Sequence, residues 1–210
     1  CVLASYASSL AAINEMESSL GVICLDINYY KTEVTIIIDD QLVFFDSSDV
    51  GLKYVNNDLQ SILNVSDEDS NKLRIKWSND NSSKNLDESD IRIKQIISSR
   101  LEEIIELALK KLKISKYYDL ANSHVVLTGE GAKHADIIDL STNIFKTKNI
   151  RIGSPQKIHG LKTIIENPSN STCLGMLNYA LSTEFQFNAK DESDKKKSVL
   201  SMLYNFFKAI

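Results

Sequence analysis

The sequence predicts an α/β fold, because patterns typical of strands alternate with patterns typical of amphipathic helices. Residues 21–47 contain three β-branched or aromatic runs separated by two short polar breaks, which predicts a meander of three strands. Residues 91–113 carry the longest helical pattern in the chain. A strand-like run at 124–128 then precedes a helical run at 135–145, and this alternation is typical of an α/β architecture.

The composition limits the kind of protein. The chain has 210 residues, of which 43% are hydrophobic and 25% charged, and this suits one or two packed domains. Three cysteines cannot form a disulfide framework, so we expect a reducing compartment. A net charge of −4 argues against broad nucleic-acid binding. Because the first residue is Cys1 and not Met, we expect a fragment or a processed product.

The first half of the chain is predicted to surround the meander with helices. We expect a helix over 1–12, a polar connector over 14–20, and a helix over 52–63 that follows Gly51. A further helix should begin at Ser66, whose side chain can cap it, and end near Arg74. Polar residues at 78–90 predict a loop.

The second half begins with the long helix, whose apolar residues recur every three or four positions. This stripe is Ile93, Ile97, Leu101, Ile104, Ala108 and Leu112. The apolar run at 124–128 predicts a buried strand, and 150–152 a short one. Asn167-Pro168 predicts a turn, and 171–181 a helix of small residues.

Two polar turns follow apolar strands and could bind a ligand. Asp26 ends the first strand at a tight turn, where a carboxylate can face a phosphate-bound metal; an ordinary hairpin with an exposed Asp is the alternative. Gly129 and Gly131 follow the strand at 124–128, where backbone N–H groups can reach a ligand, although glycine at such a turn is often structural. The two loops could face each other across a cleft.

Five motifs, in this order, carry a family resemblance. They are Gly-Val-Ile-Cys-Leu-Asp-Ile at 21–27, Ser-Asp-Glu-Asp-Ser-Asn-Lys-Leu-Arg at 66–74, Val-Leu-Thr-Gly-Glu-Gly-Ala at 126–132, Ile-Arg-Ile-Gly-Ser-Pro at 150–155 and Asn-Pro-Ser-Asn-Ser-Thr at 167–172. Over nearly the whole chain, the sequence resembles the C-terminal half of the FtsA family, actin-like ATPases of bacterial cell division.

The resemblance implies an architecture. It is the C-terminal half of an actin-like (ribonuclease H-like) ATPase domain, with a reduced inserted subdomain and a C-terminal amphipathic helix. Residues 1–50 would begin the core, 51–90 would form the inserted subdomain without one pair of strands, and 91–187 would complete the core. Residues 188–197 would be a linker and 198–210 a membrane-targeting helix.

The resemblance also implies a nucleotide site. Asp26 would orient a Mg²⁺-bound water, Thr32 and Gly51 would lie near phosphate, Asp69 and Lys72 near the ribose and base, and Gly129, Gly131 and Ala132 under the adenosine. The family's glycines after the Asp are absent here, because Asn28, Tyr29, Tyr30 and Lys31 replace them. Glu130 stands where a glycine is common. We therefore expect ATP with Mg²⁺ to bind weakly or not at all, and we expect no catalytic residue.

The tail has an amphipathic pattern that is independent of the family resemblance. Its lysines Lys195, Lys196 and Lys197 precede a helical pattern whose apolar face holds Val199, Met202, Leu203, Phe206, Phe207 and Ile210. At about 1.5 Å per residue, the helix 198–210 would span roughly 20 Å, too short to cross a bilayer but suited to lying in one. The alternative is a terminal helix docked on the protein's own core.

These features predict a binding function. The resemblance implies a membrane tether for a tubulin-like FtsZ ring, on the cytoplasmic face of the bacterial inner membrane at the division site. The expected partners are FtsZ, an anionic membrane surface and further copies that form filaments; nucleic acid is not expected. His124, His134 and His159 lack metal-ligand spacing, so we expect no metal site. The alternatives are a sugar-kinase or chaperone-type ATPase of the same superfold, which has no use for an amphipathic terminus, or a decayed relic.

Overall fold

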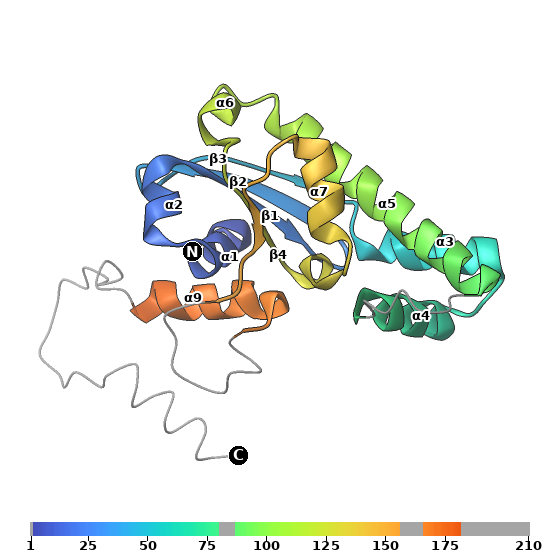
Figure 1. Cartoon of the computed structure of the whole chain (residues 1–210). Coiled ribbons are helices and arrows are strands. Elements are labelled where there is room, and N and C mark those ends of the chain that lie inside the picture. Colours follow the sequence, from blue (N-terminus) through green and yellow to red (C-terminus); the bar gives the residue numbers. More distant parts are fainter. Residues whose placement is uncertain (1, 80–86, 156–165, 182–210) are drawn as a thin grey trace, which may run out of the picture.

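A five-stranded mixed sheet lies at the centre of the computed structural model, which describes residues 2–79, 87–155 and 166–181 (Figure 1). The strands are β1 (Val22–Ile27), β2 (Thr32–Ile38), β3 (Gln41–Ser48), β4 (Val125–Thr128) and β5 (Ile150–Ile152). Their order is β3-β2-β1-β4-β5, with β1, β2 and β3 antiparallel and β1, β4 and β5 parallel. The predicted meander is confirmed.

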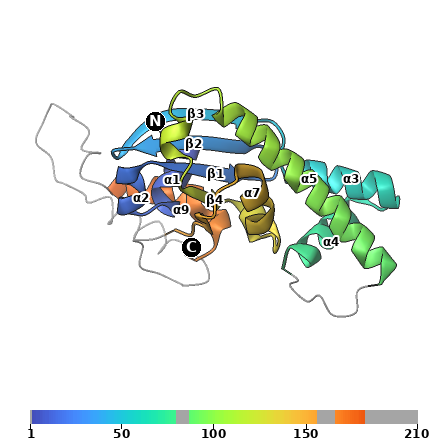
Figure 2. The same ribbon diagram turned by 45° about the horizontal axis from the view of Figure 1, so that its top comes forward.

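Helices cover both faces of the sheet (Figures 1 and 2). One face carries α1 (Ala4–Ala12) and α2 (Glu15–Leu20), and α9 (Ser171–Leu181) packs on α1. The other face carries α5 (Glu88–Leu112) and α7 (Ile137–Phe145), while α3 (Leu52–Leu63) and α4 (Asp67–Asn79) project beyond the sheet. The short helices are α6 (Tyr118–Ala121), η1 (Glu130–Lys133) and η2 (Pro168–Asn170).

Strand β1 is the centre of two apolar cores, because all six of its residues are buried. On one face Ile23, Leu25 and Ile27 join a large cluster with the apolar sides of α3, α5 and α7. On the other face Val22 and Cys24 join a smaller cluster under α1. The first strand is therefore buried on both faces, as its apolar sequence predicts. The long stripe of α5 is also buried throughout.

The predicted connector over 14–20 is wrong, because the structure forms α2 there. The Asn14 side chain accepts a hydrogen bond from Glu17 N, and the Glu17 carboxylate accepts one from Asn14 N, both at 2.9 Å. This capping box satisfies two donors at the start of the helix. Arg151 of β5 then binds Glu17, with Nε 2.6 Å from Oε1 and Nη2 2.5 Å from Oε2. A contact between residues so distant in sequence gives no local signal.

The helix that begins after Ser66 continues to Asn79, so its predicted end near Arg74 is also wrong. Ser66 does cap it, since Asp69 N donates to Ser66 Oγ at 3.1 Å. The helix continues because Trp77, in its last turns, is buried in the large core. Helix α5 starts at Glu88, inside the predicted loop, with Asp87 as its cap. Helix α6 was not predicted.

Candidate functional site

The two predicted loops lie at the ends of adjacent parallel strands, where Asp26 of β1 pairs with Thr128 of β4. They touch where the glycines of the second loop pack on the end of β1, and Tyr29 of the first loop and Glu130 of the second both border the same hollows beyond that contact, as predicted for a shared cleft. A Cβ on Gly129 would lie 2.4 Å from Asp26 Oδ1, and one on Gly131 would lie 2.4 Å from Ile27 Cγ2. Gly129 also has a φ of +83°, which favours glycine. Both glycines are therefore required by packing against β1.

The Asp26 carboxylate is buried, and protein groups hold it. Its side chain accepts hydrogen bonds from Asn28 Nδ2 at 2.9 Å and from Thr172 Oγ1 at 3.4 Å. Burial raises the pKa of Asp26 and the nearby Glu33 charge adds to this, while hydrogen bonds, led by that from Ser8, oppose the shift. Burial thus disfavours the charged form of this carboxylate.

The predicted phosphate contacts Thr32 and Gly51 lie together beside the β1–β2 turn. Thr32 Oγ1 donates to Val50 O at 2.8 Å. A Cβ on Gly51 would lie 2.4 Å from Asn28 O, so only glycine allows this approach. At the start of α3, the N–H groups of residues 52 and 53 donate to the carbonyls of residues 28 and 29, at 3.0 and 2.8 Å. The carbonyl groups of the turn therefore occupy the first N–H groups of α3, which are the kind of donors that a phosphate would need.

Two tyrosines occupy this turn in place of the glycines. The Tyr29 and Tyr30 rings meet edge-on with centroids 4.9 Å apart, and Tyr30 is 68% exposed. The Tyr29 hydroxyl accepts a hydrogen bond from Asn56 Nδ2 at 3.2 Å. Lys31, the cation nearest in sequence, pairs with Glu33 at 2.8 Å. Its charge is thus already compensated by a carboxylate at the start of β2.

The residues of α4 that point toward the site are not the predicted Asp69 and Lys72. Lys72 is exposed and pairs with Glu68 at 2.6 Å, and Asp69 is exposed beside it. Arg74 instead points toward η1, where its Nη1 lies 2.9 Å from Glu130 Oε1. It was missed, although Ser70, Arg74 and Trp77 share one buried stripe at three- and four-residue spacing, a pattern that the sequence contains.

Arg74 is 4% exposed and bridges four segments. Its Nε donates to Asn56 Oδ1 on α3, and its Nη2 donates to Asn71 Oδ1 on α4, each at 2.9 Å. Its guanidinium also lies 5.8 Å from the centroid of the Tyr29 ring. Every arm of the guanidinium therefore has a partner within the chain.

Two hollows flank this network, and both are bordered by Tyr29 and Glu130. The first, of about 610 Å³, is lined by Ala4, Asn28, Tyr29, Tyr30, Lys31, Glu33, Glu130, Ser169, Thr172, Cys173 and Met176. The second, of about 480 Å³, is lined by Tyr29, Asp67, Glu68, Asn71, Arg74, Ile75 and Glu130. Neither is bordered by Asp69 or Lys72. Ala132, predicted to lie under the adenosine, is fully buried in the large core.

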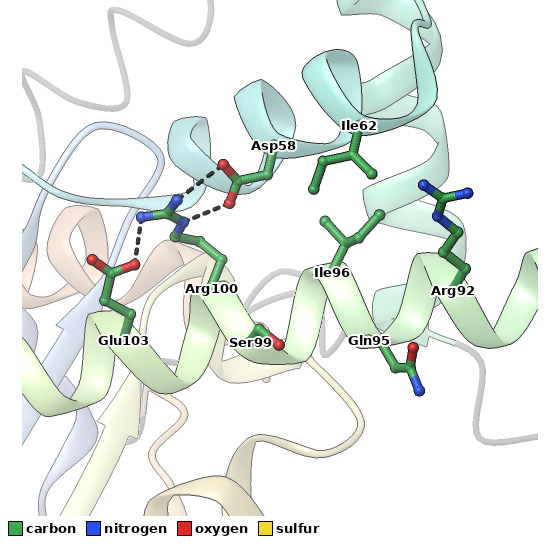
Figure 3. A pocket seen from close by; sticks show the side chains of 8 residues that line it. All are labelled: Asp58, Ile62, Arg92, Gln95, Ile96, Ser99, Arg100 and Glu103. Atoms are coloured by element: carbon green, nitrogen blue, oxygen red, sulfur yellow. Dashed lines mark hydrogen bonds and ion pairs between the residues drawn. The ribbon is translucent and has the colours of Figure 1, made fainter.

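A third hollow, of about 290 Å³, lies between α3 and α5, away from these loops (Figure 3). Arg100 crosses it and forms a two-point ion pair with Asp58, with Nε 2.6 Å from Oδ2 and Nη2 2.9 Å from Oδ1. Arg100 also pairs with Glu103 of its own helix. This ion pair fixes α3 on α5 and so supports the element from which α4 extends.

In residues 2–79, 87–155 and 166–181, no three His, Cys, Asp or Glu side chains are grouped to hold a metal ion. Within the same ranges, none of the helices combines the length and apolar character that crossing a bilayer requires. The predicted linker 188–197 and all the predicted membrane contacts of the tail lie outside the described residues.

The sheet order and the paired loops define an actin-like fold. The structure is similar to MreB5 of Spiroplasma citri bound to ADP, with a TM-score of 0.65 and 16% identity, covering 85% of this chain and 58% of that one. It is also similar to a chain of the PilM–PilN type IV pilus biogenesis complex, with a TM-score of 0.65 and 16% identity over 84% and 51% of the two chains. At these identities the likeness shows the fold alone.

Sequence comparison then identifies the family. The family model for cell division protein FtsA matches residues 23–175. FtsA of Buchnera aphidicola from Acyrthosiphon pisum is 28% identical over 233 aligned residues, covering 100% of this chain and 54% of that protein. FtsA of Rhizobium meliloti is 26% identical over 210 residues, covering 90% and 47%. The chain belongs to the FtsA family of cell-division proteins and spans about half the length of these curated relatives.

Proposed function

We propose that this chain serves bacterial cell division as part of a membrane tether for the FtsZ ring, and that it acts by binding. Membership of the FtsA family supports the cell-division role. The observation that carries the tether is the tail, where the three lysines at 195–197 precede an apolar helical face. The proposed location is the cytoplasmic face of the inner membrane at the division site.

The membrane contact would be weak for a single copy. Lysines near an anionic surface contribute about 1 kcal/mol each, and one short apolar face gives only marginal binding. Stable recruitment therefore requires several linked copies, as in a filament or ring. This requirement couples the proposed membrane contact to self-association.

Exposed apolar side chains at opposite ends of the structure support self-association. Leu20 of α2 and Leu120 of α6 are exposed at one end, where a Cβ on Gly21 would lie 3.1 Å from Leu120 O. Ile62 of α3 and Ile91 of α5 are exposed at the other end (Figures 1 and 2). Contact between unlike ends generates an open filament when the rotation between copies does not close into a ring. We propose this head-to-tail arrangement for the copies on the membrane.

The nucleotide site would be degenerate. The contacts that the resemblance implies for ATP with Mg²⁺ are Asp26, Thr32, Gly51, Asp69, Lys72, Gly129, Gly131 and Ala132. ATP would bind weakly or not at all, because Ala132 is buried in the core and neither Asp69 nor Lys72 borders the hollows. Tyr29 and Tyr30 stand where a close backbone approach is needed, and the turn carbonyls bind the first N–H groups of α3. Glu130 adds a carboxylate beside the hollow that Tyr29 and Arg74 also border. Without phosphate binding, the chain would have no ATPase role.

Recruitment of FtsZ to vesicles tests the tether. Fluorescent FtsZ is mixed with vesicles containing anionic lipid, with and without this chain, and the vesicles are floated. We expect FtsZ in the floated fraction only when the chain with its tail is present. If the chain floats with the vesicles and FtsZ stays behind, the FtsZ part of the proposal is refuted.

A further inference from the structure

The loop after β4 fastens α4 at two points, although the two segments are far apart in sequence. Arg74 Nη1 lies 2.9 Å from Glu130 Oε1, and Ala135 N donates to Ser78 O at 3.1 Å. These contacts lie on successive turns of α4. Together they fix the end of that helix against the edge of the sheet where β1 and β4 finish.

The ion pair between Arg74 and Glu130 should hold α4 more strongly than the hydrogen bond from Ala135, because the Arg74 charge is buried. A guanidinium that is 4% exposed needs a compensating charge, because desolvating an unpaired ion costs several kcal/mol. Asn56 and Asn71 supply neutral oxygens only. Among the described residues, Glu130 is the only carboxylate paired with Arg74. The negative charge that a bound anion would bring to this cation is thus already provided by the chain itself.

We propose that Arg74 and Glu130 form an internal clamp that holds α3 and α4 against the end of the sheet without a bound ligand. The inference rests on the proposed function, because it explains how the segments around a degenerate nucleotide site stay assembled. Glu130 borders both hollows, and Arg74 borders the second. Through Asn56 and Tyr29 the clamp also fixes α3 and the β1–β2 turn.

Hydrogen exchange of the full chain without nucleotide tests the clamp. In Glu130→Gln we expect amides of α4 and η1 to exchange at least about tenfold faster than in the wild type, because the buried cation loses its partner. Amides of β1 should not change. The matched control is Glu68→Gln, which makes the same chemical change in an ion pair on α4 that is exposed on both sides. We expect this control to exchange like the wild type.

A double-mutant comparison shows whether the two residues act as a pair. If they form a clamp, Arg74→Gln with Glu130→Gln should exchange no faster at η1 than Glu130→Gln alone, because the uncompensated charge is gone. Unchanged exchange in Glu130→Gln, or effects of the two substitutions that multiply independently, would overturn the clamp. Tight binding of labelled ATP to the wild type, with the exchange pattern as expected, would instead overturn the degenerate site and leave the clamp intact.

Discussion

Replacing Gly175 by Ala should destabilise the protein, although the change favours a helix. Helices α1 and α9 cross at this glycine, and a Cβ there would lie 1.8 Å from Ala7 O and 2.5 Å from Ala7 C. Both atoms belong to the α1 backbone, so no rotamer change can relieve the clash. Since real Cβ atoms keep at least 3.0 Å from such atoms, the helices must separate by more than 1 Å.

The magnitude follows from two opposing effects. Gly→Ala inside an exposed helix stabilises by about 1 kcal/mol through helix propensity. Overpacking at a close crossing costs about 1–3 kcal/mol, occasionally more, and here the displaced atoms are backbone. Any shift of α1 also strains the hydrogen bond between Ser9 Oγ and Thr35 Oγ1, which is 2.6 Å long and holds α1 on the sheet. We expect a net loss of about 1–2 kcal/mol.

Urea unfolding followed by circular dichroism measures this loss. The control is Ala180→Gly, which changes helix propensity by a similar amount at an exposed position of the same helix. Ala180→Gly should destabilise by propensity alone, about 1 kcal/mol or less near the helix end. If Gly175→Ala proves more stable than the wild type, propensity outweighs the crossing, and the reasoning from the 1.8 Å approach is refuted.

Three further predictions concern charges and the nucleotide. Burial raises the pKa of Asp26, so ionisation of this carboxyl opposes folding. The stability of the protein therefore falls as the pH rises from 3.8, the ordinary pKa of the group, through its pKa in the folded state. Urea titrations should show that Asp26→Asn has a larger stability advantage over the wild type at pH 7 than below pH 4. Burial opposes ionisation of Glu17 too, but hydrogen bonds from Arg151 and Asn14 outweigh this effect and lower the pKa of Glu17. Glu17→Gln should therefore reduce the free energy of unfolding by about 1.5–3 kcal/mol at pH 7, and by less once the pH falls below 4.5. A reduction that does not depend on pH would contradict this. Equilibrium titration with labelled ATP and Mg²⁺ should give no saturation in the low micromolar range, and saturation there would show that the tyrosines leave the phosphate position open.

Local pattern predicted most of the sheet and of the long helix. The apolar run of β1 and the stripe of α5 are local patterns, so the sequence carries their signal. Helix α2 has too few apolar residues to produce such a signal. It depends on a capping box and on Arg151, which lies in a strand far along the chain. Pairings of this kind become visible only in the folded chain.

In the candidate site, too, local patterns could be predicted from the sequence and contacts between distant segments could not. The position of the two loops could be predicted, since a strand ending in Asp26 and another ending before Gly129 mark them. Their contact partners could not, because both glycines pack on β1 and the first N–H groups of α3 bind the turn. On α4 the resemblance indicated Asp69 and Lys72, whereas the structure places Arg74 toward η1. That difference depends on which face of the helix meets the sheet.

Vesicle co-sedimentation tests the central claim, that the tail binds the chain to anionic membranes. The wild type is compared with Phe206→Asp/Phe207→Asp, with the matched variant Ser201→Asp/Asn205→Asp on the polar face, and with a chain that ends at Asp194. We expect the wild type to pellet with anionic vesicles, less at high salt, and the polar-face variant to pellet more than the apolar-face variant. The apolar-face variant and the shortened chain should stay in the supernatant with unchanged circular dichroism of the core. Equal pelleting of all four proteins would contradict the tether.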